Sequence, residues 1–206
     1  MKLKVLAYRM YRWFYKITKI ISKIRLHHEY FYFHDLKNIP PVKSPKIEIE
    51  IRHLFEGDEK ILHQVWPIDL IKVKKRLNLA HSVCYLTYFQ DELIAYQWVQ
   101  FKGAHYIQQA NKSIFLKEKE EFIIYHARVK KEFQSLGINK YIKQVILQDF
   151  YSKGFTNGFI YTSSENIANQ KGIDKLGFKR YIIVPSIQIG SKFYQLKKWP
   201  FGDDIK

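Results

Sequence analysis

Apolar residues recur every three or four positions near the start of the chain, and basic residues fill the other side of a helix drawn through them. The apolar positions are Leu6, Met10, Trp13, Phe14, Ile17, Ile20, Ile21 and Ile24. The basic positions opposite them are Arg12, Lys16, Lys19 and Lys23. This spacing predicts a basic amphipathic helix over residues 1 to about 26.

Two interpretations of this helix stay open. In the first, the helix lies in an anionic membrane interface, with Trp13 and Phe14 inserted and its cations facing the lipid headgroups. In the second, its apolar stripe packs on the protein's own domain. The first interpretation adds peripheral contact with the inner face of a membrane to a cytoplasmic protein.

Three prolines separate this segment from the rest of the chain. Pro40, Pro41 and Pro45 predict an extended linker, because proline ends helices and favours extended geometry in the residue before it. The sequence therefore divides into an N-terminal segment, a linker and one folded domain, at residues 1–36, 37–46 and 47–206.

The pattern beyond the linker switches between strand-like and helix-like spacing. Ile47, Ile49 and Ile51 alternate with polar residues, which predicts a half-buried strand. Apolar runs predict further strands over residues 82–89, 92–101, 122–129, 157–162, 181–189 and 192–199. Helical spacing covers residues 56–66, 68–79, 140–153 and 166–176. Residues 103–119 are predicted to be irregular or to contain a short strand.

Basic residues far outnumber acidic ones. The 206 residues include 35 Lys plus Arg and 19 Asp plus Glu, which gives a formal net charge of +16. Such an excess favours an anionic partner, and nucleic acid, anionic lipid and a phosphorylated cofactor are all candidates. No zinc-finger or RNA-recognition signature is present, so nucleic acid is the least favoured of the three.

Cysteine and histidine usage excludes several site types. The only cysteine, Cys84, excludes an internal disulfide and a multi-thiolate zinc site, and it fits a reducing, cytoplasmic compartment. His27, His28 and His34 have no cysteine or carboxylate at a recognised ligand spacing, so no metal site is predicted. No stretch approaches the roughly 18 apolar residues that a membrane-spanning helix needs.

A glycine turn connects the predicted strand at 122–129 to the predicted helix at 140–153. Gly137 lies within this turn, at residues 134–139. A helix N-terminus presents unpaired backbone N–H groups and the positive end of the helix dipole, and both favour phosphate. The turn is therefore a candidate phosphate site, although a glycine between a strand and a helix is also common as a plain turn.

Two motifs resemble the GCN5-related N-acetyltransferase superfamily. The first is the cofactor motif of that superfamily, Gln or Arg, two residues, Gly, one residue, then Gly or Ala; here it reads Gln134, Ser135, Leu136, Gly137, Ile138, Asn139, with Val129 five residues before it. The second is an Asn after the fifth strand and a short helix closing in Lys-Leu-Gly-Phe; here it is Asn166 and residues 175–178. The resemblance covers residues 47–199, and Asn139 departs from the usual Gly or Ala.

The resemblance implies a fold class and a cosubstrate. The fold would be α/β in the broad sense (α+β), with a mixed, mostly antiparallel central sheet flanked by helices. The cosubstrate would be acetyl-CoA or another acyl-CoA, with its pantetheine arm paired to backbone and its pyrophosphate on the glycine turn. The resemblance assigns these residues to binding it: Arg128, Val129, Gln134, Ser135, Leu136, Gly137, Ile138, Asn139, Lys140, Asn166 and Asn169.

The superfamily's usual general acid is absent. Many members carry a Tyr seven residues after the motif Asn, and Ile173 occupies that place here. A thiol with a pKa near 8.5 can leave as thiolate without full protonation. Tyr161 and Ser163, at the end of the strand at 157–162, are the candidate replacements, with a core aromatic as the alternative interpretation of Tyr161.

Tyr125 and His126 compete for the role of general base on the strand at 122–129. In an uninterrupted strand Tyr125 shares a face with Val129, and His126 points to the other face. A β-bulge, which is common next to active sites, would exchange them. Histidine has the better pKa for the role, although a buried sheet histidine is an equally simple interpretation.

Two classes of function follow. The first is an N-acyltransferase that moves an acyl group from acyl-CoA to a primary amine, with an amino sugar of a surface-polysaccharide pathway as the favoured acceptor. The second is a catalytically inactive module of the same fold that binds anionic lipid or nucleic acid. A third hypothesis joins the two: an acyltransferase held at the cytoplasmic face of a membrane by residues 1 to about 26, acting on a lipid-linked amine. In that case, removing residues 1–35 would abolish liposome binding and spare turnover of a soluble substrate.

Overall fold

A computed structural model describes residues 24–41, 44–57, 59–78 and 81–196. Its main feature is an eight-stranded sheet. In spatial order the strands are β10 (Lys192–Gln195), β9 (Lys179–Ile189), β1 (Ile24–Asp35), β8 (Asn157–Ser163), β7 (Glu121–Val129), β4 (Glu92–Gln100), β3 (Ser82–Phe89) and β2 (Glu50–His53). Only β7 and β8 run parallel, and the other neighbours in this sheet are antiparallel. The predicted mixed, mostly antiparallel sheet is confirmed.

The helices cover both faces of the sheet. On one face α4 (Ile138–Ser152) and α5 (Ile167–Lys175) bury side chains of β7 such as Phe122 and Ile124. On the other face lie α2 (Glu59–Val65), α3 (Leu70–Asn78) and the hairpin of β5 (Gly103–Ile107) and β6 (Lys112–Leu116). There they bury the alternate residues Ile123 and Tyr125, because successive side chains of a strand point to opposite faces.

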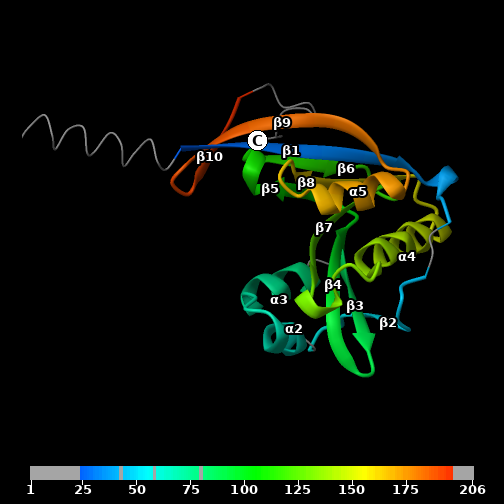
Figure 1. The fold of residues 1–206 in the computed structure, drawn as a ribbon. Coiled ribbons are helices and arrows are strands. Elements are labelled where there is room, and N and C mark those ends of the chain that lie inside the picture. Colours follow the sequence, from blue (N-terminus) through cyan, green and yellow to red (C-terminus); the bar gives the residue numbers. More distant parts are fainter. Residues whose placement is uncertain (1–23, 42–43, 58, 79–80, 197–206) are drawn as a thin grey trace, which may run out of the picture.

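The strand β1 corrects the predicted limits of the folded domain. It lies inside the sheet, paired with β8 on one side and β9 on the other (Figure 1). Phe31 and Tyr32 are both fully buried, one on each face. A strand buried on both faces shows no apolar-polar alternation, which is why the sequence pattern left residues 24–36 outside the domain. The rest of the predicted amphipathic helix lies outside the described residues.

The described part of the predicted linker also packs on the domain. Leu36–Asn38 form a short 3₁₀ helix, η1, and Ile39 contacts the core next to α4. The Pro40 carbonyl accepts a hydrogen bond from Gln144 Nε2 (3.2 Å), and Lys46 N donates to the Leu136 carbonyl (3.2 Å). This stretch therefore runs along α4 and the glycine turn.

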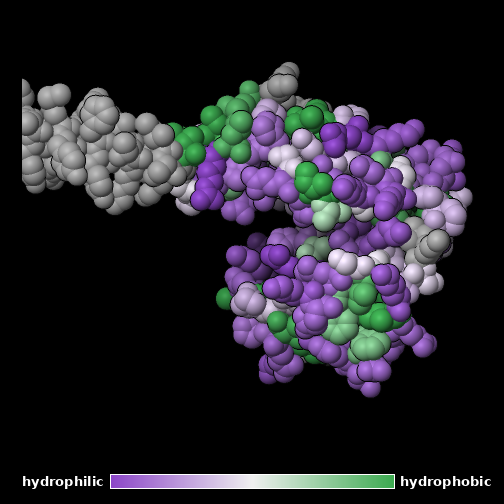
Figure 2. Space-filling view, viewed as in Figure 1, coloured by the Kyte–Doolittle hydropathy of each residue, from purple (hydrophilic) through white to green (hydrophobic). Residues whose placement is uncertain are grey.

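The remaining elements differ from the predicted ones mainly at their ends. The segment 103–119, predicted to be irregular or a short strand, contains the β5–β6 hairpin. Helix α4 begins at Ile138, two residues before its predicted start, because Gly137 supplies the left-handed N-cap conformation. No helix within the described residues is long and apolar enough to span a membrane. Figure 2 shows hydrophilic residues over most of the visible face and a hollow between the two halves of the molecule.

Candidate active site

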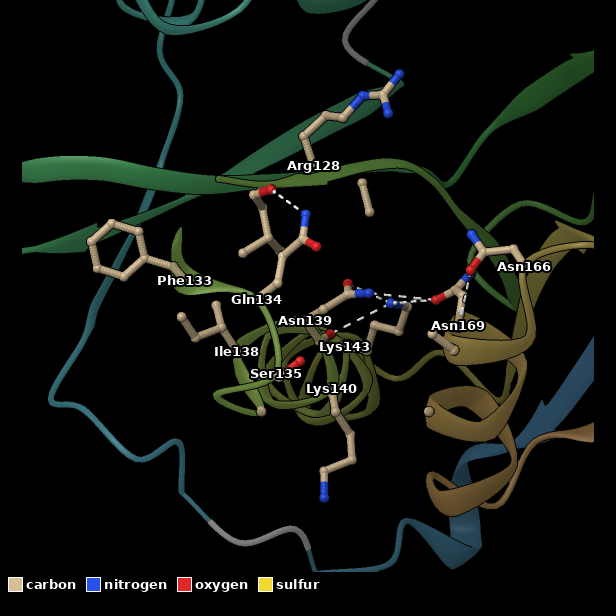
Figure 3. Close-up of a pocket in the computed structure, with 15 residues that line it drawn as sticks. Arg128, Phe133, Gln134, Ser135, Ile138, Asn139, Lys140, Lys143, Asn166 and Asn169 are labelled. Carbon is tan, nitrogen blue, oxygen red and sulfur yellow. Dashed lines mark hydrogen bonds between the residues drawn. The ribbon is translucent and has the colours of Figure 1, made fainter. Parts of the chain in front are cut away.

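The two parallel strands in the middle of the sheet separate before they end. β7 and β8 pair from Glu121 and Asn157 as far as Ile124 and Ile160. Beyond that point β7 stays paired with β4 up to Val129, while β8 stays paired with β1 up to Ser163. The resulting gap opens onto the N-terminus of α4, where a cavity of about 560 Å³ lies (Figure 3).

All but one of the residues assigned to cosubstrate binding line this cavity. They are Arg128, Val129, Gln134, Ser135, Gly137, Ile138, Asn139, Lys140, Asn166 and Asn169. The exception is Leu136, which packs against the core beside α4. The sequence motifs and the cavity therefore coincide, although Gln134 and Asn166 lie 32 positions apart in the sequence.

The glycine turn has the geometry of an anion site. Ser135 and Gly137 have φ values of +65° and +89°, so the chain bends sharply before α4 begins. Among the described residues no side chain caps the N-terminus of this helix. Its first backbone N–H groups thus stay available at the cavity, as phosphate binding requires. Gln134 Nε2 donates to the Val129 carbonyl (3.3 Å) and ties the turn to β7.

Lys143 lines the cavity and was missed by the sequence interpretation. Its side chain is buried, and its Nζ donates to Asn139 Oδ1 (2.5 Å) and to Asn169 Oδ1 (3.3 Å). This network joins α4 to α5 across the floor of the cavity (Figure 3). Asn139, the departure from the family motif, therefore has its side-chain oxygen held by Lys143. Burial lowers the pKa of Lys143 to about 7.

A β-bulge decides between the two orientations of His126. Trp98 of β4 faces Tyr125, and Tyr96 faces Arg128, so His126 and Ala127 together oppose a single residue. His126 has a φ of +48°, and its ring centroid lies 5.7 Å from that of Tyr125. The bulge thus leaves Ala127 at the cavity and groups His126 with Tyr125.

The surroundings of His126 hold it neutral. Its pKa is lowered, first by partial loss of hydration and then by the charges of Arg76, Arg128 and Lys72, although its side chain stays exposed to solvent. A neutral imidazole at pH 7 is able to accept a proton, and the lowered pKa makes it a weaker base than a free histidine. Burial raises the pKa of the Tyr125 hydroxyl, so this residue stays protonated and cannot serve as the base.

The hydroxyl group of Tyr161 forms a hydrogen bond with a buried histidine. Gln100 Nε2 donates to two carbonyls, so Gln100 Oε1 accepts the proton of His105 Nδ1 (2.9 Å). His105 Nε2 is then the acceptor for the Tyr161 hydroxyl, at 3.3 Å. Burial lowers the pKa of His105 to about 3 and raises that of Tyr161, which fits this direction of the bond. Tyr161 would have to give up the bond to protonate a leaving thiolate.

Glu29 is a second residue that the sequence interpretation missed, because it lies in the strand placed outside the domain. Its side chain is 3% exposed, and it pairs with Ser163 on the same sheet face as the stacked rings of Phe31 and Tyr161. Burial, and next the charge of Glu165, raise its pKa to about 7. An aromatic run such as residues 30–33, buried on two faces, was the available signal for this strand.

A Glu29→Gln variant is expected to gain stability relative to the wild type as the pH rises. The raised pKa means that the folded wild type binds more protons than the unfolded chain between pH 4.5 and 7, so its stability falls across this window. Gln does not titrate, and the difference should grow by at most about 3 kcal/mol. Urea unfolding of both proteins at several pH values measures it, and a constant difference would contradict the buried acid.

Neither an acid at position 173 nor a metal site is found among the described residues of the site. Ile173, at the position where many members of the superfamily carry a Tyr, is fully buried in the core beside α4 and offers no proton. Within the described residues no group of three His, Cys, Asp or Glu side chains is placed to hold a metal ion.

Comparison with known proteins rests on structure. No protein-family model and no curated protein matches the sequence. A GCN5-related N-acetyltransferase from Sphaerobacter thermophilus superposes on 88% of this chain with a TM-score of 0.57 and 11% identity. The fold is that of the GCN5-related N-acetyltransferases, abbreviated GNAT.

Two further structural matches differ in length. AAC(6')-Iy, solved with the bisubstrate analogue CoA-S-monomethyl-acetylneamine, matches 66% of this chain and 95% of its own, with 20% identity and a TM-score of 0.51. A Drosophila protein matches 84% of this chain, with 13% identity and a TM-score of 0.55. This chain spans only 54% of the Drosophila protein and 55% of the Sphaerobacter protein. At these identities the likeness shows the GNAT fold alone.

Proposed function

We propose that this protein transfers an acyl group from acyl-CoA to a primary amine. The observation that carries the proposal is the cavity where β7 and β8 separate, with the uncapped N-terminus of α4 at its edge. Backbone N–H groups at such a turn suit a pyrophosphate, and the gap suits an extended pantetheine arm paired with β7. Lys140, at the cavity edge, adds positive charge near the phosphates.

The proposed chemistry is direct attack by the amine. The amine nitrogen forms a bond to the thioester carbonyl carbon, the carbon–sulfur bond breaks, and CoA leaves as thiolate. A backbone N–H of β7 near Val129 polarises the carbonyl oxygen. His126, neutral and grouped with Tyr125 beside the gap, accepts the amine proton directly or through water. The favoured acceptor is a small molecule such as an amino sugar.

The test is calorimetric titration with acetyl-CoA at about 0.15 M salt. A Gly137→Trp variant should bind at least tenfold more weakly, about 1.4 kcal/mol, because the indole fills the turn at the cavity. Gly154→Trp is the matched control. Gly154 has a φ of +87°, close to the +89° of Gly137, so both substitutions place a tryptophan in a similarly strained backbone conformation. A Cβ added at Gly154 meets no atom within 4 Å.

The outcomes separate the two classes of function. Saturable binding that Gly137→Trp loses and Gly154→Trp keeps supports the cosubstrate site and justifies a screen of amine acceptors. A wild-type protein that binds no acetyl-CoA would refute the proposal and favour the inactive module.

A further inference from the structure

A group of basic side chains surrounds His126 on the face of the sheet opposite α4 and α5. Lys72 and Arg76 come from α3, and Arg128 comes from β7; we call these three residues the basic rim. All three act on the His126 imidazole through their charge. Arg76 also acts on His105, Tyr125 and Tyr161, so it stands at the centre of the cluster beside the gap.

The two arginines of the basic rim have no counter-ion in the described part of the chain. Only Lys72 has one there, Asp69 at 3.5 Å. The Arg76 guanidinium carbon lies 5.4 Å from the ring centroids of Trp98 and of Tyr125. These rings hold the guanidinium by a cation–π contact and leave its fork of N–H donors open to a planar or tetrahedral anion.

The basic rim flanks the route by which an acceptor must arrive. Helices α4 and α5 cover one face of the gap, so the acceptor has to approach from the other face, where Tyr125 and His126 lie. Arg128 belongs to the edge of the cosubstrate cavity, yet its side chain points away from Asn139 and Asn169 (Figure 3). It therefore faces toward the acceptor side.

The same face carries acidic groups on the other side of the gap. Glu29 of β1 acts on Tyr161 through its charge, and Glu165 acts on Glu29. The acceptor side is thus positive along α3 and β7, while beyond the gap lie Glu29, which is buried in β1 and has a raised pKa, and the exposed Glu165 that follows β8. A molecule that has both an anionic group and an amine matches this division of charge.

We propose that the acceptor is a primary amine that also carries a phosphate or another anionic group, which the basic rim binds. This inference rests on the proposed acyltransferase function and names the class of its second substrate. The cations that bind the anion also favour the neutral form of a nearby amine, which is the form that attacks a thioester. A polycationic acceptor would be repelled by the same residues.

The experiment titrates CoA-saturated protein with two matched pairs of probes. They are glucosamine 6-phosphate with glucosamine, and O-phosphoethanolamine with ethanolamine. In the wild type the phosphorylated member of at least one pair should bind at least tenfold more tightly. Arg76→Gln should remove most of this preference, and Arg76→Lys, which keeps the charge, should retain a measurable part of it.

Arg180→Gln is the matched control. Arg180 also stacks on a tyrosine, with its guanidinium carbon 4.2 Å from the ring centroid of Tyr30, but Tyr30 packs on the α4 side of the sheet. This variant should keep the wild-type preference. Equal binding within both pairs, no binding by either phosphorylated probe, or an unchanged preference in Arg76→Gln would overturn the inference. Failure of CoA to bind in the first step would instead refute the proposed function.

Discussion

A protein that lacks residues 1–35 is expected to lose its cooperative unfolding transition and its binding of acyl-CoA. The deletion removes β1, which pairs with β8 and β9 along most of its length. It also removes Phe31 and Tyr32, both fully buried. Each large core side chain contributes about 3–5 kcal/mol, and a domain of this size is stable by only about 5–15 kcal/mol.

A second deletion, of residues 1–23, is the control for the first. It leaves every described strand and helix in place. This protein should therefore melt cooperatively and bind acetyl-CoA like the full chain. Circular dichroism during heating and calorimetric titration measure both properties. Cooperative melting of the protein without residues 1–35 would contradict the role of β1, and it would restore the hypothesis that this segment lies outside the fold.

The second large effect concerns Lys143 and alkaline pH. The pKa of its amine is lowered to about 7 by burial. Between pH 7 and the ordinary lysine value of 10.5 the unfolded chain binds the proton and the folded protein does not, so wild-type stability rises across this window. Met at position 143 fills similar space and does not titrate. The stability of the wild type minus that of Lys143→Met should rise by about 4 kcal/mol over this range.

The pH series contains its own control. Well below pH 7, at about pH 5.5 and lower, Lys143 is protonated in both states, so the difference between wild type and Lys143→Met should be constant there. Guanidinium unfolding at closely spaced pH values measures both ranges, and other titrating groups cancel in the difference. A difference that stays flat up to pH 10.5 would show that the amine is not buried as the structure has it.

The cosubstrate side of the site could be predicted from sequence because short motifs encode it locally. The turn around Gly137 needs a glycine for its positive φ, and Asn166 caps α5 by accepting from Asn169 N (3.1 Å). Each requirement involves residues that are near neighbours in the chain. The resemblance in these two motifs therefore pointed to residues that line one cavity, and their role in binding a cosubstrate stays a prediction.

The acceptor side could not be predicted in the same way, because its residues meet only through tertiary contacts. Arg76, His105 and Glu29 come from three separate elements and share no local pattern. The orientation of His126 depends on a bulge that the pairing of β7 with β4 creates. Lys143 resembles a solvated helix lysine until α5 is packed against α4.

The place of β1 in the sheet also constrains how the chain folds during synthesis. Among the described strands, β1 is synthesised long before its partners β8 and β9, as the pairing of Glu29 with Ser163 illustrates. At about 5–20 residues per second the apolar run at residues 30–33 waits for several seconds without its partners. Such long-range pairing slows folding and exposes unpaired strand edges to other chains. We therefore expect the yield of native protein to depend strongly on chaperones and on low temperature during expression.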